Sequence, residues 1–195
     1  MSSPFRIELV TDDERFLQKA AITHSRNLNG TLTSARGAGT VLALYRHLVA
    51  HRHAVYLVLR DEHVVGGLVT LRQGERYSPL TLLLSHPMSW LRAVRRLGLP
   101  EFLRQIWDLV KVQRRRSRLH ECDYILALYV DEEFRKHGLA RQLLSRVITD
   151  ARDRRRGLAV DTLLQNQPAR RLYDSCGFVE QGRTSRSLIL SLNEG

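Results

Sequence analysis

Alternation of apolar and polar residues predicts a first strand in residues 5–10, which read FRIELV. Between residues 12 and 27 the apolar positions recur at helical spacing, and acidic residues occupy the first turn, where the helix dipole favours them. A loop rich in glycine, serine and threonine, residues 29–40, is expected to lead into a second helix over 41–50. The chain therefore begins with the pattern of a strand followed by two helices.

Two β-rich runs follow in residues 54–73, and the polar turn between them predicts a hairpin. Residues 75–120 interrupt the pattern with three prolines and two stretches of amphipathic helical spacing. The apolar positions of these two expected helices are Trp90, Leu91, Val94, Leu97, Phe102, Leu103, Ile106, Trp107 and Val110. The continuous apolar run at 122–130, CDYILALYV, is typical of a strand buried at the centre of a sheet.

The C-terminal part alternates between helix and strand. A helical apolar stripe runs from Leu139 to about Arg152, and a strand is expected at 157–164. A short helix is expected within 166–178, and a last strand at 183–193. The order is β-α-α-β-β, a helical insertion, then β-α-β-α-β, which predicts a mixed α/β fold in one domain over residues 1–195.

Composition narrows the class of protein. The hydrophobic fraction is 43% and the charged fraction 26%, values of an ordinary globular protein. No apolar run approaches the roughly 18 residues needed to span a bilayer, and the N-terminus lacks the apolar core of a signal peptide. Cys122 and Cys176 are too few for a disulfide framework and lack metal-ligand spacing, so we expect reduced thiols, a cytoplasmic location and no metal.

The net charge of +11 is concentrated in residues 92–118. This segment holds nine basic and two acidic residues, a net +7. Such a segment could bind RNA or another nucleic acid, or lie on an anionic membrane surface. We favour neither reading over a solvated basic face, because no recognition motif with interleaved aromatic residues is present.

A basic glycine loop, residues 135–140, stands between the central strand and the following helix. The first amides of a helix lack internal partners and the dipole is positive there, so a loop of this kind can bind phosphate groups. The loop lacks the spacing of a nucleotide-binding P-loop and of the dinucleotide fingerprint. Taken alone, it is equally well read as a polar turn.

A second motif downstream decides between these readings. The loop fits the pattern R/Q-x-x-G-x-G/A, and residues 166–178, NQPARRLYDSCGF, fit N-x-x-A-x-x-L-Y-x-x-x-G-F. With both motifs in this order, the chain resembles the GCN5-related N-acetyltransferase (GNAT) superfamily everywhere except the insertion. The resemblance implies a mixed sheet with two splayed central strands, and acetyl-CoA as co-substrate.

The resemblance also assigns roles to single residues. The backbone of Leu128, Tyr129 and Val130 would pair with the pantetheine arm, and Asn166 would hydrogen-bond it. Tyr173 would act as general acid toward the departing thiolate. The residues expected to hold the pyrophosphate are Arg135, Lys136, His137, Gly138, Leu139 and Ala140.

The two motifs leave the general base open. Many family members carry a glutamate at the position of Tyr124, so a direct carboxylate base is in doubt here. Glu121 is our candidate, although it and Asp123 have the opposite strand parity. Cys176 is expected to be a buried, inert thiol rather than a nucleophile.

The sequence thus predicts an acetyl-CoA-dependent N-acetyltransferase that transfers acetyl to a small-molecule primary amine in a ternary complex. Two alternatives stay open: acylation of a macromolecule, either a protein amine or an aminoacyl-tRNA, and a non-catalytic acyl-CoA sensor. The insertion is expected either to form a wall or lid of the acceptor site or to thicken the core. Homodimerisation also stays open.

Overall fold

The structure is a computed structural model that describes residues 4–28, 31–75, 88–116, 119, 121–184 and 186–193. Side chains are not described for residues 32, 33, 88, 89 and 108–116 within these ranges. The described strands form a seven-stranded sheet in the order β1-β2-β3-β4-β5-β7-β6. β4 and β5 are parallel, and the other neighbouring pairs are antiparallel.

The elements have the following bounds. The strands are β1 Arg6–Val10, β2 Ala54–Arg60, β3 His63–Leu71, β4 Cys122–Val130, β5 Gly157–Leu163, β6 Val179–Arg183 and β7 Ser187–Leu192. The helices are α1 Glu14–Asn27, α2 Leu32–Ala35, α3 Ala38–Ala50, α5 Met88–Leu97, α6 Leu99–Arg116, the short 3-10 helix η1 Glu132–Phe134, α7 Leu139–Asp153 and α8 Gln167–Asp174.

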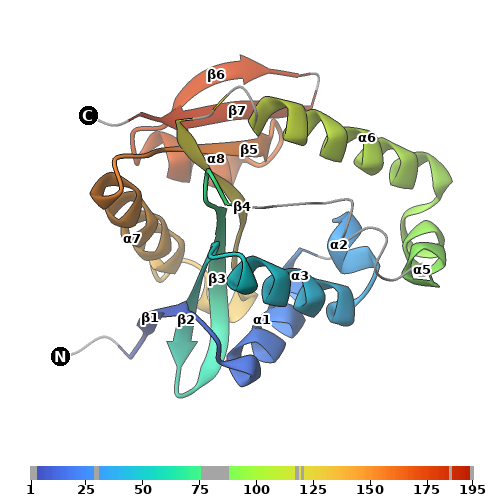
Figure 1. Ribbon diagram of the computed structural model, residues 1–195, viewed down its shortest axis with the longest axis horizontal. Helices are drawn as coiled ribbons and strands as arrows, with labels where there is room; N and C mark the ends of the chain where they lie inside the picture. The colour runs from blue at the N-terminus through green and yellow to red at the C-terminus, as the bar shows by residue number, and fades with distance from the viewer. Residues whose placement is uncertain are drawn as a thin grey trace.

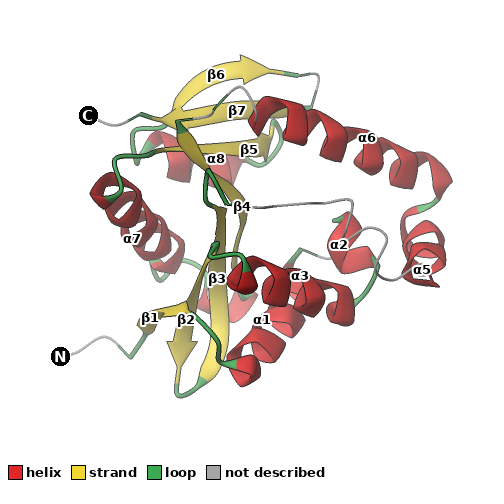
Figure 2. Ribbon diagram, in the orientation of Figure 1, coloured by secondary structure: helices red, strands yellow, loops and turns green. Residues whose placement is uncertain are grey.

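Helices cover the sheet on both faces (Figures 1 and 2). α1 and α3 bury Leu17, Leu44 and Leu48 against one face of the N-terminal strands. α7 buries the predicted apolar stripe against the opposite face, in a cluster that also contains Tyr173 of α8. β4 lies in the middle of the strand order, which confirms the central position predicted from its continuous apolar sequence.

The helix α2, the 3-10 helix η1 and the strand β6 were not predicted from the sequence. The loop expected over 29–40 contains the short helix α2, and α3 begins at Ala38 rather than at Val41. Four residues are too few to show a helical period, which explains the first omission. β6 was also missed, because its sequence VEQGR is an exposed edge strand without an apolar face.

The helical insertion is confirmed where it is described. α5 and α6 meet at Gly98, whose φ of 78° turns the chain between them. Residues 76–87, which belong to the expected insertion, lie outside the described residues. Within the described part of the chain, no helix is both long and apolar enough to cross a membrane.

A buried ionic network fixes α7 against the sheet. Arg154, just after α7, forms an ion pair with Asp123 of β4 at 2.6 Å and donates to Asp150 at 3.1 Å. Asp123 is fully buried and also accepts from the backbone N–H of Gln73 at 2.8 Å. Arg72, beyond the end of β3, donates to the same Asp150. The position of α7 over β4 is therefore set by charge pairing as well as by apolar packing.

A chain of buried polar side chains joins α1, α3 and β4. His24 Nδ1 lies 2.8 Å from the Tyr45 hydroxyl, which lies 3.0 Å from the Tyr129 hydroxyl. Tyr129 donates to the carbonyl of Ala20 at 3.4 Å. Gly67 of β3 leaves the space for this arrangement, since a Cβ there would lie 2.7 Å from the Tyr129 hydroxyl. Burial lowers the pKa of His24 to about 4.

We predict that His24 makes the protein less stable in acid. The unfolded chain takes up a proton at His24 below its ordinary pKa of 6.5, whereas the folded chain does so only near 4. Between these values the unfolded state binds more protons, so stability rises with pH and is lost as pH falls from 6.5 to 4. The full loss is roughly 3 kcal/mol.

Chemical denaturation of the wild type and of His24→Gln across this pH range measures the effect. The variant should have a flatter profile, and His63→Gln, at an exposed histidine that begins β3, should keep the wild-type profile. A His24→Gln protein with the same pH dependence as the wild type would show that another group is responsible.

Candidate active site

The two central strands separate half-way along their length. β4 and β5 pair in parallel only from Cys122 with Gly157 to Ile125 with Val160. Beyond that point β4 keeps its pairing with β3 as far as Val130, and β5 keeps its pairing with β7 on its other edge. At the same point along β4 the register with β3 shifts by one residue. Leu126 has no partner on β3 and forms a β-bulge. The result is an opening between β4 and β5.

Backbone groups of β4 face this opening. The N–H of Asp131 donates to the carbonyl of Val65 on β3 at 2.8 Å. In an antiparallel strand the N–H and C=O groups of successive residues point to opposite edges. The backbone groups of Tyr129, two residues before Asp131, therefore also point to β3. Leu128 and Val130 therefore face the opening. Their edge has no strand partner, and the N–H and C=O of Leu128 and the N–H of Val130 can bind an extended chain that carries amide groups.

The glycine loop lies where β4 ends and α7 begins. Gly138 is the N-cap of α7 with φ 75°, and no side chain caps this helix end. The first helical hydrogen bond runs from the Gln142 N–H to the Gly138 carbonyl at 3.0 Å. The amides of Leu139 and Ala140, which come earlier, therefore have no acceptor within the helix. A Cβ on Gly138 would find only the Gln142 side chain within 4 Å. The space over the helix end is therefore open to an anion, and Gly138 keeps it open.

Arg135 supports this loop through contacts within the chain. Its Nε donates to the carbonyl of Val130 at 3.1 Å, and its guanidinium donates to Asn27 at 3.2 Å. Asn27 in turn donates to Asp131, which also pairs with Arg26. The guanidinium is exposed and lies beside the loop, so it can add positive charge there while it holds the strand end.

The other charged residues of the loop are exposed. Lys136 adopts a left-handed φ of 67°, and His137 Nδ1 lies 3.0 Å from the carbonyl of Arg135. The neighbouring Phe134 packs edge-on against Phe5, at 6.0 Å between ring centroids. An apolar anchor thus fixes a loop whose polar groups remain at the surface.

Asn166 and Tyr173 are brought to the same side of the sheet by α8. Asn166 is the N-cap of α8, and its Oδ1 accepts from the Ala169 N–H at 3.2 Å. Among the described residues none accepts from its Nδ2, so this group can donate to a ligand. Tyr173 is buried against Phe178, in one cluster with Val130 and Val160. Burial raises its pKa above the ordinary value, and no described side chain hydrogen-bonds its hydroxyl.

The carboxylates are placed differently from the sequence-based expectation. Glu121 is exposed just before β4, four residues and about 13 Å of extended chain before Ile125, so the structure does not bring it to the opening. Asp123 is committed to Arg154. Asp161 follows Val160 directly at the opening.

Asp161 lies on the face of the sheet that Tyr124 occupies. Ala159 and Tyr124 share one buried cluster, and residues two apart in a strand share a face, so Asp161 lies on the Tyr124 side. Sequence reasoning passed over this half-buried residue. The signal was present, because Asp161 is the one acidic residue in the apolar run 157–164.

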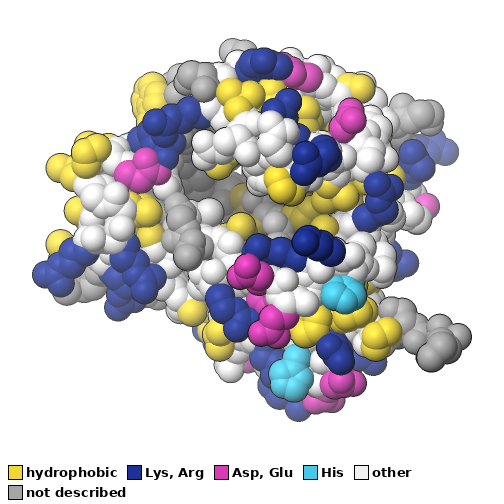
Figure 3. Space-filling view, turned by 180° about the vertical axis from the view of Figure 1, so that it is seen from behind, with side chains coloured by type: hydrophobic (Ala, Val, Ile, Leu, Met, Phe, Trp, Pro, Cys, Tyr) yellow, Lys and Arg dark blue, Asp and Glu magenta, His cyan; other side chains and the backbone are white. Residues whose placement is uncertain are grey.

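The insertion is attached beside α2 and α3. The Arg36 guanidinium lies 4.4 Å from the centre of the Trp90 ring, and Arg92 donates to the Arg36 carbonyl at 3.0 Å. Figure 1 shows α2, α3, α5 and α6 on one side of β4 and α7 on the other. Seen from behind, the molecule is hollowed near its centre, with hydrophobic side chains inside and Lys or Arg side chains at the rim (Figure 3).

A separate cavity of about 350 Å³ lies between α8 and the strands β6 and β7. Its lining is Gln167, Arg170, Arg171, Asp174, Phe178, Glu180, Leu188 and Leu190. It shares no residue with β4 or the glycine loop, so it is not the opening described above.

Comparison with known proteins assigns the family. The profile of the Acetyltransferase (GNAT) family matches residues 28–178, which include the opening, the glycine loop and α8. The chain belongs to this family. As a GNAT acetyltransferase it uses acetyl-CoA, and the resemblance predicted from the two motifs is confirmed. No curated protein sequence gives a significant match to the chain.

Solved structures of GNAT proteins share the fold across nearly the whole chain. The yncA protein of Salmonella typhimurium, solved with its cofactor acetyl-CoA, has a TM-score of 0.59 and 18% identity over 99% of this chain and 95% of its own. The ribosomal-protein-S18-alanine N-acetyltransferase of Escherichia coli has a TM-score of 0.58 and 14% identity, over 96% of this chain and 93% of its own. NAA60 of Arabidopsis thaliana, solved with a bisubstrate analogue, has a TM-score of 0.57 and 15% identity, over 96% of this chain and 97% of its own. The mixed sheet with splayed central strands is thus the GNAT fold.

We predict that Gly138→Ala weakens acetyl-CoA binding at least tenfold. The added Cβ would occupy the open space over the α7 amides and strain a backbone at φ 75°. Gly98→Ala is the matched control, since φ is 78° there and the residue lies between α5 and α6. Both variants should lose about 1–2 kcal/mol of stability.

Isothermal titration with acetyl-CoA and thermal denaturation separate the two effects. Binding should fall only in the Gly138 variant. Equal affinity in the two variants would show that the helix end does not contact the pyrophosphate.

Proposed function

We propose that this enzyme transfers the acetyl group of acetyl-CoA directly to a primary amine of a small molecule, within a ternary complex. The neutral amine attacks the thioester carbonyl, the C–N bond forms, and collapse of the adduct breaks the C–S bond. The ammonium proton of the acceptor leaves to a base, and the thiolate of CoA accepts a proton. The observation that carries the proposal is the opening between β4 and β5 beside the uncapped N-terminus of α7.

Acetyl-CoA would lie along this opening. Its pantetheine amides would pair with the N–H and C=O of Leu128 and the N–H of Val130, and the Nδ2 of Asn166 would donate to the arm from the other side. The amides of residues 136–140 would hold the pyrophosphate, with Arg135 and Lys136 adding charge. The polar groups that the structure leaves available at these positions suit each of these contacts.

Tyr173 would protonate the departing thiolate. Its phenol is protonated at neutral pH, and burial strengthens that state by raising its pKa. It belongs to the cluster that contains Val130 and Val160, the residues on either side of the opening. Because no described residue competes for its hydroxyl proton, that proton is available to the sulfur.

A small-molecule acceptor is favoured by the position of the insertion. α5 is fixed against the segment before α3 by the contacts of Trp90 and Arg92 with Arg36. This arrangement adds a helical wall on the Tyr124 side of β4, where the acceptor would approach. The named protein acetyltransferases among the structural neighbours keep a protein amine as the alternative class. The two free cysteines are compatible with the cytoplasmic location that we propose.

The reaction itself tests this proposal. We expect release of free CoA thiol in the presence of a small primary amine from a library, with intersecting initial-rate lines, because both substrates must be bound together. Tyr173→Phe should lower kcat by about 100-fold or more, a typical contribution of general acid catalysis, while the Kd for acetyl-CoA stays within about twofold.

Thermal denaturation of Tyr173→Phe should match the wild type, since its hydroxyl makes no described hydrogen bond. Turnover confined to peptide or aminoacyl-tRNA acceptors would overturn the small-molecule assignment. Parallel initial-rate lines would overturn direct transfer.

The general base can be assigned by comparing two carboxylates. Glu121 is the sequence-based candidate, but Asp161 lies at the opening on the Tyr124 side, and we propose it as the base. Asp161→Asn should lower kcat/KM by about 100-fold or more and remove the acidic limb of its pH profile, and Glu121→Gln should change little. The reverse result would assign the role to Glu121. If both variants kept their activity, a chain of water molecules would have to remove the proton from the amine.

A further inference from the structure

The α5–α6 helices carry an exposed apolar surface. Leu91, Leu99, Leu103 and Trp107 are 56–57% exposed, although all are large hydrophobic residues. They are half of the exposed large hydrophobic residues in the described part of the chain, and they lie within 17 positions of one another. Large apolar side chains that cluster at the surface mark a binding face. We call these four residues the α5–α6 surface.

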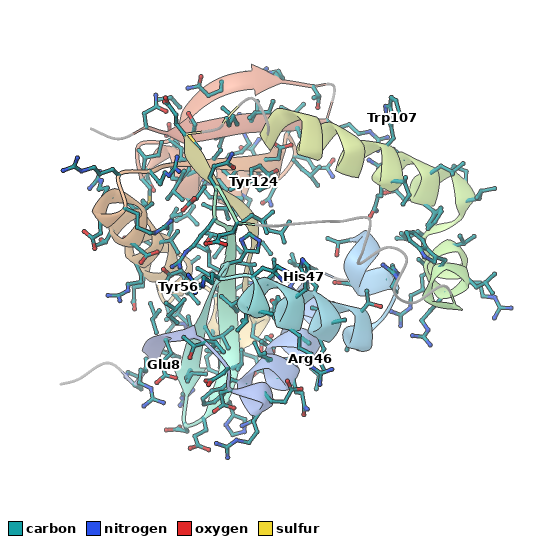
Figure 4. The ribbon with its side chains drawn as sticks, viewed as in Figure 1. Glu8, Arg46, His47, Tyr56, Trp107 and Tyr124 are labelled. Carbon is teal, nitrogen blue, oxygen red and sulfur yellow. The ribbon has the colours of Figure 1, made fainter. Side chains whose placement is uncertain are left out.

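Three of the four residues form one row on α6. Leu99, Leu103 and Trp107 follow one another at intervals of four, which places them along one side of a helix. Figure 4 shows Trp107 pointing away from the body of the molecule, and Figure 1 shows α6 and α5 as an arm at its edge. The row is therefore on the outer side of the arm rather than toward the sheet.

Positive charge accompanies the apolar row. Arg95 and Arg96 are exposed in the last turn of α5. The sequence of α6 continues after Trp107 with Lys111 and three consecutive arginines, and residues 92–118 carry a net +7. Lys and Arg side chains also gather at this edge in the view from behind (Figure 3). The partner must therefore offer both negative charge and an apolar phase.

We propose that the α5–α6 surface docks on an anionic membrane surface, with Leu99, Leu103 and Trp107 inserted at the level of the headgroups. A tryptophan beside leucines on a basic helix has the composition of an interfacial amphipathic helix. A nucleic acid would use the arginines but would leave the leucine row exposed. A second copy of the chain would bring another +11 charge and the same basic segment, which opposes pairing.

Vesicle binding by the full-length chain tests the proposal. Co-sedimentation with vesicles rich in phosphatidylglycerol should exceed that with pure phosphatidylcholine by about tenfold or more, and salt should weaken it. In a Trp90→Phe background, Trp107 emission should shift to shorter wavelength on the anionic vesicles only, because its ring leaves water.

Variants separate insertion from charge attraction. Leu103→Ser and Trp107→Ser should each lower vesicle binding several-fold and keep acetyl-CoA binding and the melting temperature. Ile22→Ser is the matched control, since Ile22 is 61% exposed on α1, and it should bind vesicles like the wild type. Unchanged binding in Leu103→Ser, equal binding to both vesicle types, or retention on tRNA in place of vesicles would overturn the proposal. Concentration-dependent dimers that Leu103→Ser abolishes would overturn it as well.

Discussion

The early end of pairing between β4 and β5 is the constraint on which the rest of the site depends. A continuous parallel pair would satisfy the backbone groups of Leu128 and Val130 within the sheet and leave nothing for a ligand. β5 keeps its pairing with β7, on its other edge, from Leu158 to Leu163. β5 therefore stays in the sheet, while the facing edges of both β4 and β5 have no strand partner at the opening.

The opening is useful only because α7 begins beside it in a fixed position. The ion pair of Asp123 with Arg154 joins the paired part of β4 to the residue just after α7, and Asp150 adds contacts to Arg72 and Arg154. At the other end of the helix, Arg135 holds the Val130 carbonyl. Both ends of α7 are therefore tied to β4, and removal of Arg154 would leave the Asp123 charge buried without a counter-ion. The same helix packing that stabilises the fold keeps the amides of the helix start in register with the strand edge.

Much of this arrangement could be predicted from residue patterns. The apolar run of β4, the stripe of α7 and the two motifs were enough for the mixed α/β fold, the family and acetyl-CoA as co-substrate. Features without a periodic signal were missed, such as the four residues of α2 and the exposed strand β6. Asp161 stands out in the sequence as the one acidic residue of an apolar run, but its place at the site depends on where β4 and β5 separate, which only the tertiary structure gives. The same is true of Trp107, whose helical spacing resembled that of a core residue but whose side chain is exposed.

Amide hydrogen exchange on β4 tests the central claim most directly. We expect acetyl-CoA to slow exchange at the Leu128 and Val130 amides by at least an order of magnitude, because they gain partners in the pantetheine arm. The Tyr129 amide, which faces β3, should change little and serves as the internal reference. Unchanged exchange at Leu128 and Val130 under saturating acetyl-CoA would contradict the account, since it would show that the ligand does not pair with the vacant edge of β4.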